Sequence, residues 1–171
     1  QFWRHTLADI TPDIVTMGKP MGAGHPMGGT IARRELLDRL GAHYEYFSTF
    51  AATPVSAAAG NAVLDVLEDG GLMTSAPVTG TLLREGLSAL ACEHAALGQV
   101  RGIGLVAGVD LFPDDLGSAR ARSQDLLERL AGAQVLAGLT GPNGTVLKVR
   151  PPLTWTSRHV ELFLNALKTV L

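Results

Sequence analysis

Lys19 is the residue whose surroundings in the sequence most clearly allow chemistry. It follows a short β-prone run, residues 13–17, and lies between Gly18 and Pro20, which interrupt regular structure. The next segment, residues 21–29, is rich in glycine, so its backbone can approach a ligand closely. A lysine just past a strand end can meet a ligand there, and burial near another cation would help its amine lose a proton. Spacing alone also allows a solvated loop lysine.

Two other kinds of site are not supported by the spacing of residues. Gly102, Gly104 and Gly108 do not match the dinucleotide-binding fingerprint, which needs a helix directly after the glycines. The five histidines are scattered, and no pair has the spacing of a zinc site on a helix. The sequence therefore implies no metal.

Composition favours a soluble α/β protein. Of the 171 residues 46% are hydrophobic and 18% charged, which is enough to build an apolar core. A net charge of -2 and a pI near 6.2 provide no strong field for nucleic acid or an anionic membrane. No apolar run approaches the length of a membrane-spanning helix, and Cys92, alone in a helical stretch, is expected to be a buried, inert thiol. We expect a cytoplasmic protein.

The elements that must position Lys19 come from the first seventy residues. After the strand at 13–17 we expect a short strand at 30–32, a helix from 33 to 40 that ends at Gly41, and an extended aromatic run at 44–50. A second helix should begin at Thr53 and Pro54, since threonine can cap free amides and proline suits the first helical position. It should end at Gly70 and Gly71.

The remaining residues predict a compact α+β unit. We expect a helix over 74–96, regular from Pro77 onward, and a long bent or bulged strand over 100–112. The further predicted elements are a helix at 118–130, strands at 134–139 and 145–149, and a final helix capped by Thr156. This organisation places a domain boundary near residue 70. Residues 1–70 would be the end of a larger α/β sheet, and residues 71–171 a small carboxy-terminal domain.

Residues 12–29 carry the most specific pattern in the chain. They have the sequence Pro-Asp-Ile-Val-Thr-Met-Gly-Lys-Pro-Met-Gly-Ala-Gly-His-Pro-Met-Gly-Gly. This segment resembles the part of class III aminotransferases in which a lysine holds pyridoxal 5'-phosphate as a Schiff base. The resemblance implies a fold type I enzyme in which Lys19 binds the cofactor, is displaced by an amino substrate, and then moves a proton between the substrate and the cofactor.

Gly24, His25 and Pro26 narrow this resemblance. They are similar to the branch that contains alanine–glyoxylate aminotransferase and the phospho-lyases of phosphorylated amino alcohols. His25 could face the active site or fix the loop, and we assign it no catalytic role.

Two later segments resemble the same family in the same order. Residues 47–54 are similar to a segment that usually has the sequence Ser/Asn-Thr-Phe-Gly-Gly-Asn-Pro, and the resemblance implies that Thr49 binds the phosphate of the cofactor in a partner subunit. Alanines at 51 and 52 depart from that pattern, which leaves the loop angles open. Residues 147–154 resemble the small-domain strand that carries a carboxylate-binding arginine, here Arg150. The simpler alternatives are a strand threonine and an arginine that pairs with an acidic side chain.

The resemblance implies a homodimeric enzyme that exchanges an amino group between an amino acid or amine and a 2-oxo acid. A phospho-lyase that acts on a phosphorylated amino alcohol would use the same lysine. The chain opens on Gln1 and soon enters the lysine segment, so we expect it to be the later part of a longer protein. The family's phosphate-binding turn, stacking aromatic residue and ring-pairing aspartate would precede it, and the piece alone would be inactive. A non-catalytic folding or dimerisation module is the remaining alternative.

Overall fold

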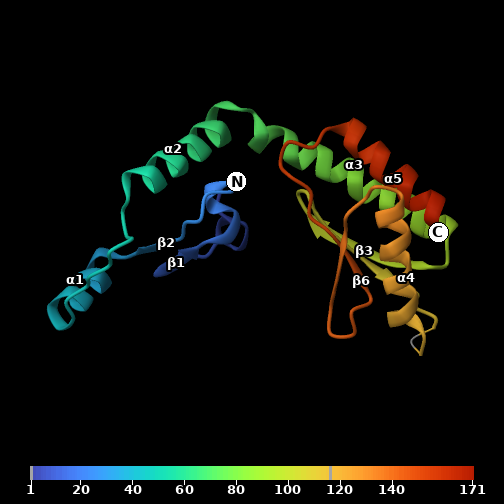
Figure 1. The fold of residues 1–171 in the computed structure, drawn as a ribbon, viewed down its shortest axis with the longest axis horizontal. Coiled ribbons are helices and arrows are strands. Elements are labelled where there is room, and N and C mark those ends of the chain that lie inside the picture. Colours follow the sequence, from blue (N-terminus) through green and yellow to red (C-terminus); the bar gives the residue numbers. More distant parts are fainter. Residues whose placement is uncertain (1, 116) are drawn as a thin grey trace. The chain divides into compact units, whose positions relative to one another are not determined.

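The computed structural model describes residues 2–115 and 117–171, which fall into two compact units divided between Met73 and Thr74. Both units contain helices and strands, so the α/β class is confirmed (Figure 1). The boundary between the units lies three residues after the one expected at residue 70. The assignment of the two parts to a cofactor-binding domain and a small domain stays a prediction.

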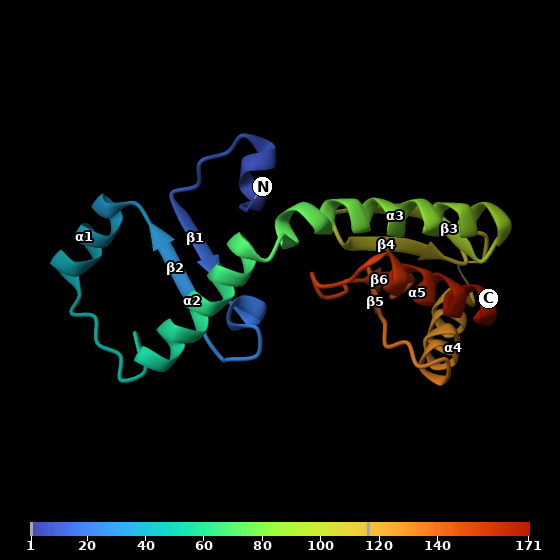
Figure 2. The ribbon, with the colours of Figure 1, turned by 90° about the horizontal axis from the view of Figure 1, so that it is seen from above.

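The first unit contains a two-stranded antiparallel sheet. Strand β1, Ile14–Met17, pairs with β2, Gly29–Ala32 (Figure 2). In this register Met17 lies opposite Gly29. Both strands were predicted. A short 3-10 helix, η1 (Arg4–Ala8), precedes them, and a second one, η2 (Lys19–Gly22), begins the segment that joins them. The turn that starts with Lys19 therefore begins two residues after the end of β1.

The elements after β2 differ in part from those expected. Helix α1 covers Arg34–His43 and continues through Gly41, because the amide of Tyr44 still bonds to Leu40. The aromatic run that follows is exposed and forms no strand, since residues 44–48 pair with no neighbour and 49–52 form a turn. The extended run expected at 44–50 thus gives way to a turn from residue 49, and the helix end expected at Gly41 was wrong.

Helix α2, Pro54–Asp69, has the predicted bounds. The hydroxyl oxygen of Thr53 accepts a hydrogen bond from the amide of Ser56 at 3.2 Å, and Pro54 occupies the first helical position. Threonine thereby satisfies an amide that the helix itself leaves without a partner, and proline lacks the amide that would need one.

The second unit is a four-stranded antiparallel sheet with helices on one face. Its strands are arranged in the order β3-β4-β6-β5. The elements are α3 (Leu72–Glu93), β3 (Leu97–Ile103), β4 (Val106–Leu111), α4 (Ala119–Gly132), β5 (Gly138–Thr140), β6 (Val146–Val149) and α5 (Ser157–Val170). Alternate residues of β4 and β6, such as Val109 and Leu147, are fully buried against leucines of α3, α4 and α5. This cluster is the core of the unit.

The predicted strand over 100–112 is instead a hairpin. Strands β3 and β4 pair in antiparallel fashion, and the chain reverses at Gly104, whose backbone is left-handed (φ 52°). A bulge does occur, but at the start of β3, between Leu97 and Val100. Helix α3 correspondingly ends at Glu93 and not at 96, because Leu97 already pairs with Leu111. It also begins at Leu72, before Pro77 and not at it.

The strand expected at 134–139 is reduced to Gly138–Thr140 by the way α4 ends. Gln134 is left-handed (φ 62°), its amide bonds to Ala131, and the amide of Val135 bonds to Leu130. This is a Schellman motif, which satisfies the last carbonyls of a helix and turns the chain away from it. The amides directly after α4 therefore bond to the end of the helix, and β5 begins only at Gly138.

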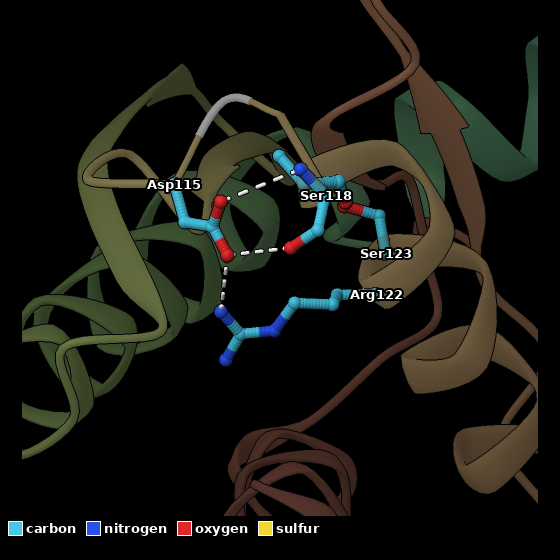
Figure 3. A network of polar contacts seen from close by, with 5 residues as sticks. Asp115, Ser118, Arg122 and Ser123 are labelled. Atoms are coloured by element: carbon cyan, nitrogen blue, oxygen red, sulfur yellow. Dashed lines mark hydrogen bonds and ion pairs between the residues drawn. The ribbon is translucent and has the colours of Figure 1, made fainter.

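The start of α4 is held by a polar network (Figure 3). The carboxylate of Asp115 accepts hydrogen bonds from the hydroxyl and the amide of Ser118 and forms an ion pair with Arg122 at 3.2 Å. Helix α5 is capped by Thr156, as predicted, and the amide of Thr156 donates to His159 at 3.0 Å.

Two expectations about surface and environment have different outcomes. Cys92 is exposed on α3, so the prediction of a buried thiol was wrong: it lies on the side of the helix that faces away from Leu87 and Leu90. Among the described residues no helix is long and apolar enough to cross a membrane.

Candidate active site

Lys19 lies at a strand end in an unusual backbone conformation. It directly follows Gly18, which is extended, and its own φ is 50°, in the left-handed region. That conformation costs a residue with a side chain about 1–2 kcal/mol, and such strain is concentrated at functional sites. The amide of Met21 bonds back to Gly18 at 3.2 Å and closes the turn. The side chain of Lys19 is exposed in this chain and thus accessible to a ligand.

The other two lysines of the chain occupy different settings. Lys168 forms an ion pair with Glu93 at 2.9 Å and so joins α5 to α3. Lys148 lies within β6, opposite Gly108 and Gly138 in the neighbouring strands. Of the three lysines, Lys19 is therefore the one that follows a strand end and opens a turn.

A hydrogen-bonded chain connects the Lys19 segment to α2, and sequence reasoning missed it. Nε2 of His25 lies 2.9 Å from the hydroxyl oxygen of Ser56, which accepts a hydrogen bond from the hydroxyl of Thr53 at 2.8 Å. The contact spans 31 positions. The hydroxyls at the start of α2 were visible as helix caps, but nothing local links a cap to a distant histidine.

Thr49 lies in the exposed turn that leads into α2. Ala52 in this turn is left-handed, with φ 55°. Glycine favours that conformation, and the family pattern has a glycine at the corresponding position. Although alanine replaces glycine here, Ala52 still has the backbone conformation that glycine favours. Thr49 lies three residues before Ala52 in this turn.

Arg150 directly follows β6 in the second unit. It lines a shallow pocket of about 160 Å³ together with Lys148, Trp155 and Phe163. Among the described residues no ion pair involves Arg150, which argues against the alternative of an arginine paired with an acidic side chain. Lys19 and Thr49 share the first unit, whereas Arg150 belongs to the second.

The donor groups fit the cofactor that the family segment implies. A primary amine such as that of Lys19 is the group that combines with an aldehyde, and a threonine hydroxyl can donate to a phosphate oxygen. Within the residues that the structure describes, no group of three or more His, Cys, Asp or Glu side chains could hold a metal ion. The amine of Lys19 and the hydroxyl of Thr49 are groups of the kinds that such a cofactor needs.

Comparisons with known proteins agree with the fold and the segment. Residues 1–171 match the family described as aminotransferase class III. The chain is 36% identical to an ethanolamine-phosphate phospho-lyase homolog from Caenorhabditis elegans, covering 100% of this chain and 38% of that protein. It is 35% identical to a mitochondrial alanine–glyoxylate aminotransferase 2 homolog from Arabidopsis thaliana, covering 97% of this chain and 35% of that protein.

Solved structures agree as well. A phospholyase from Arthrobacter in complex with phosphoethanolamine has a TM-score of 0.92 and 40% identity, covering 98% of this chain and 40% of that chain. An amine transaminase from a Pseudomonas species, in its PLP-bound form, has a TM-score of 0.82 and 29% identity, covering 95% of this chain and 38% of that chain.

The fold is therefore that of the fold type I pyridoxal phosphate enzymes, as expected. The chain belongs to the class III aminotransferase family, whose cofactor is pyridoxal phosphate. It spans less than two fifths of the length of the curated relatives named above.

Proposed function

We propose that this chain is the later part of a longer protein, the parent protein, that transfers an amino group between an amino acid or amine and a 2-oxo acid. The observation that carries the proposal is the placement of Lys19: a strained, left-handed lysine with an exposed side chain, directly after β1. Its segment matches that of the family's cofactor lysine. The relatives that are named aminotransferases support the same reaction class.

Each of the three site residues has a chemical task in this proposal. Nζ of Lys19 would hold the cofactor and would carry a proton to or from the substrate carbon. The hydroxyl of Thr49 donates to the cofactor phosphate in a partner subunit of a homodimer, and the guanidinium of Arg150 binds a substrate carboxylate through paired hydrogen bonds. When bound, pyridoxal phosphate supplies the electron sink for the bond broken at the substrate carbon.

A second candidate is a phospho-lyase that releases phosphate and ammonia from a phosphorylated amino alcohol. The 40% identity and TM-score of 0.92 to the Arthrobacter phospholyase favour it, as does the phospho-lyase homolog from the worm. Lys19 would have the same tasks, while Arg150 could bind the substrate phosphate. Product analysis of the purified parent protein separates the two: a new amino acid formed from a 2-oxo acid indicates transamination, and inorganic phosphate released from phosphoethanolamine indicates the lyase.

Peptide mapping tests the role of Lys19. The parent protein is incubated with pyridoxal phosphate, reduced with borohydride and digested, and we expect the label on Lys19. A label on Lys148 or Lys168 would remove the basis of the proposal. The isolated chain serves as a further arm: turnover without the rest of the parent protein would contradict our view that the chain is inactive alone. A cytoplasmic location and a homodimer stay predictions.

A further inference from the structure

We propose that His25 is a positioning residue that fixes the Lys19 turn on the first turn of α2. The inference rests on the proposed function, in which Lys19 holds the cofactor. It concerns how the chain keeps that lysine in place, and its basis is the contact of His25 with Ser56 together with the packing around Gly22.

The backbone of His25 is attached to the turn that Lys19 begins. The amide of His25 donates to the carbonyl of Gly22 at 3.0 Å, and Gly22 is the last residue of η2. Gly22 is buried, and a Cβ added there would lie 2.9 Å from Cγ of Met27. A shift of His25 would therefore move the turn as well.

Side chains also pack the segment that follows β1 against α2. Met27 contacts both Gly22 and Gly60, since a Cβ built on Gly60 would lie 3.1 Å from Cε of Met27. Figure 2 shows the segment after β1 beside α2, and η2 and α2 are in contact. The methionine is flexible and apolar, so it fills space without fixing a direction. The directional contact is the hydrogen bond between half-buried His25 and half-buried Ser56.

The hydroxyl pair can serve either tautomer of the His25 ring. When Nε2 carries no hydrogen, it accepts the proton of Ser56 while Thr53 donates to Ser56. When Nε2 carries the hydrogen, it donates to Ser56, and Ser56 can then donate to Thr53 instead. The contact therefore forms with either tautomer, which suits a residue that holds a position.

This contact also joins the Lys19 turn to the segment that carries Thr49. Thr53 is both the end of the hydrogen-bonded chain and the cap of α2, and it lies four residues after Thr49. The two residues proposed to contact the cofactor are therefore tied to one helix start. Loss of the hydrogen bond between His25 and Ser56 should weaken cofactor binding without removing any group that contacts the cofactor.

The experiment uses the parent protein with bound pyridoxal phosphate and measures the rate at which the cofactor is lost on dialysis. For His25→Phe we expect loss about tenfold faster, which corresponds to about 1.4 kcal/mol and to one broken hydrogen bond that leaves a partner unsatisfied. Ser56→Ala should have a similar effect, and the double variant should be no worse than the larger single effect. His25→Gln, which can still reach Ser56, should restore the parent rate.

The matched control is His43→Phe, which removes a bond of Nδ1 of His43 to the carbonyl of Arg39 at 2.8 Å, in α1. It should leave cofactor loss unchanged. Equal rates for His25→Phe and His43→Phe, additive effects of the His25 and Ser56 variants, or failure of His25→Gln to restore the rate would each overturn the proposal. Lys19→Ala separates a failure of the His25 proposal from a failure of the proposed function. If that variant still attaches the cofactor covalently, the proposed function itself is wrong, whatever the His25 variants show.

Discussion

Residues 1–73 and 74–171 differ sharply in how much of their apolar surface they bury. All eighteen buried hydrophobic side chains of the described residues lie between Ala76 and Leu167. The described residues include twenty-two exposed large hydrophobic side chains, of which fifteen lie in the first unit. Phe47 and Phe50, for example, are 82% and 87% exposed. The second unit therefore carries its own core. A two-stranded sheet such as β1–β2 is marginal by itself, so we expect that the first unit needs further protein to cover its apolar side chains.

This difference also separates the proposed site residues. Lys19, Thr49 and His25 belong to the unit that lacks a core, whereas Arg150 follows a strand of the unit that has one. We therefore expect the residues proposed to hold the cofactor to be ordered only together with other parts of the parent protein. The arginine proposed to bind the substrate would be in place without them.

The largest effect that we expect is a difference in folding between the two units when each is expressed separately. Residues 72–171, which keep α3 whole, should unfold in urea in one cooperative transition followed by circular dichroism. Residues 1–71 should show no such transition, because they bury too little apolar surface to offset the entropy of ordering the chain. A cooperative transition of residues 1–71 would mean that the first unit is more self-sufficient than its exposed side chains indicate.

Gly80→Ala tests how tightly the second unit is packed. A Cβ on Gly80 would lie 1.9 Å from the carbonyl oxygen of Gly104, which belongs to the backbone of the β3–β4 turn and cannot move aside cheaply. We expect a loss of about 3 kcal/mol in the free energy of unfolding of residues 72–171, measured in urea. The control is Gly132→Ala in α4, where nothing lies within 4 Å of the added atom. That change should stabilise by a few tenths to about 1 kcal/mol; a similar small effect at Gly80 would contradict close packing there.

The elements that sequence predicted well are those with local signals. Thr53 and Pro54 start α2, and Thr156 starts α5, because capping depends on residues within one turn of the helix. The β3–β4 hairpin was missed because a glycine such as Gly104 fits a bend within one strand as well as a turn between two strands. The close approach of this turn to Gly80 of α3 is not visible within the segment itself.

The same distinction explains what could be predicted of the site. Lys19, Thr49 and Arg150 come from contiguous segments that can be matched one by one to a family. The contact between His25 and Ser56 joins residues that are distant in sequence, so only the fold brings it into view.

Arg150→Lys tests whether the second unit contributes to the site independently of the first. Lysine keeps the charge but cannot form paired hydrogen bonds to a carboxylate. In the parent protein we expect KM for a carboxylate substrate to rise about tenfold, as for the loss of one charge-assisted hydrogen bond, with retention of the cofactor unchanged. Arg158→Lys, in the first turn of α5, is the control. Faster loss of the cofactor in Arg150→Lys would show that the two groups of site residues are not independent.

The smallest expected effect concerns Asp115, at the start of α4 (Figure 3). The hydroxyl of Ser118, then its amide, and the guanidinium of Arg122 lower the pKa of this carboxyl below its ordinary value. Because the pKa is lower in the folded state, the carboxylate stabilises the fold above the pKa of the unfolded chain, about 4, and this contribution is lost as pH falls through the folded value.

The measurement compares the urea midpoint of residues 72–171 with that of the Ser118→Ala variant from about pH 6 to pH 2, on both sides of the ordinary carboxyl pKa. Ser118→Ala removes the largest cause of the shift, so its midpoint should fall less steeply with acid. Lys168 lowers the pKa of Glu93 in the same pH range, but this pair is intact in both proteins and cancels in the difference. Parallel curves would mean that the exposed network at α4 adds nothing to the stability that the core already supplies.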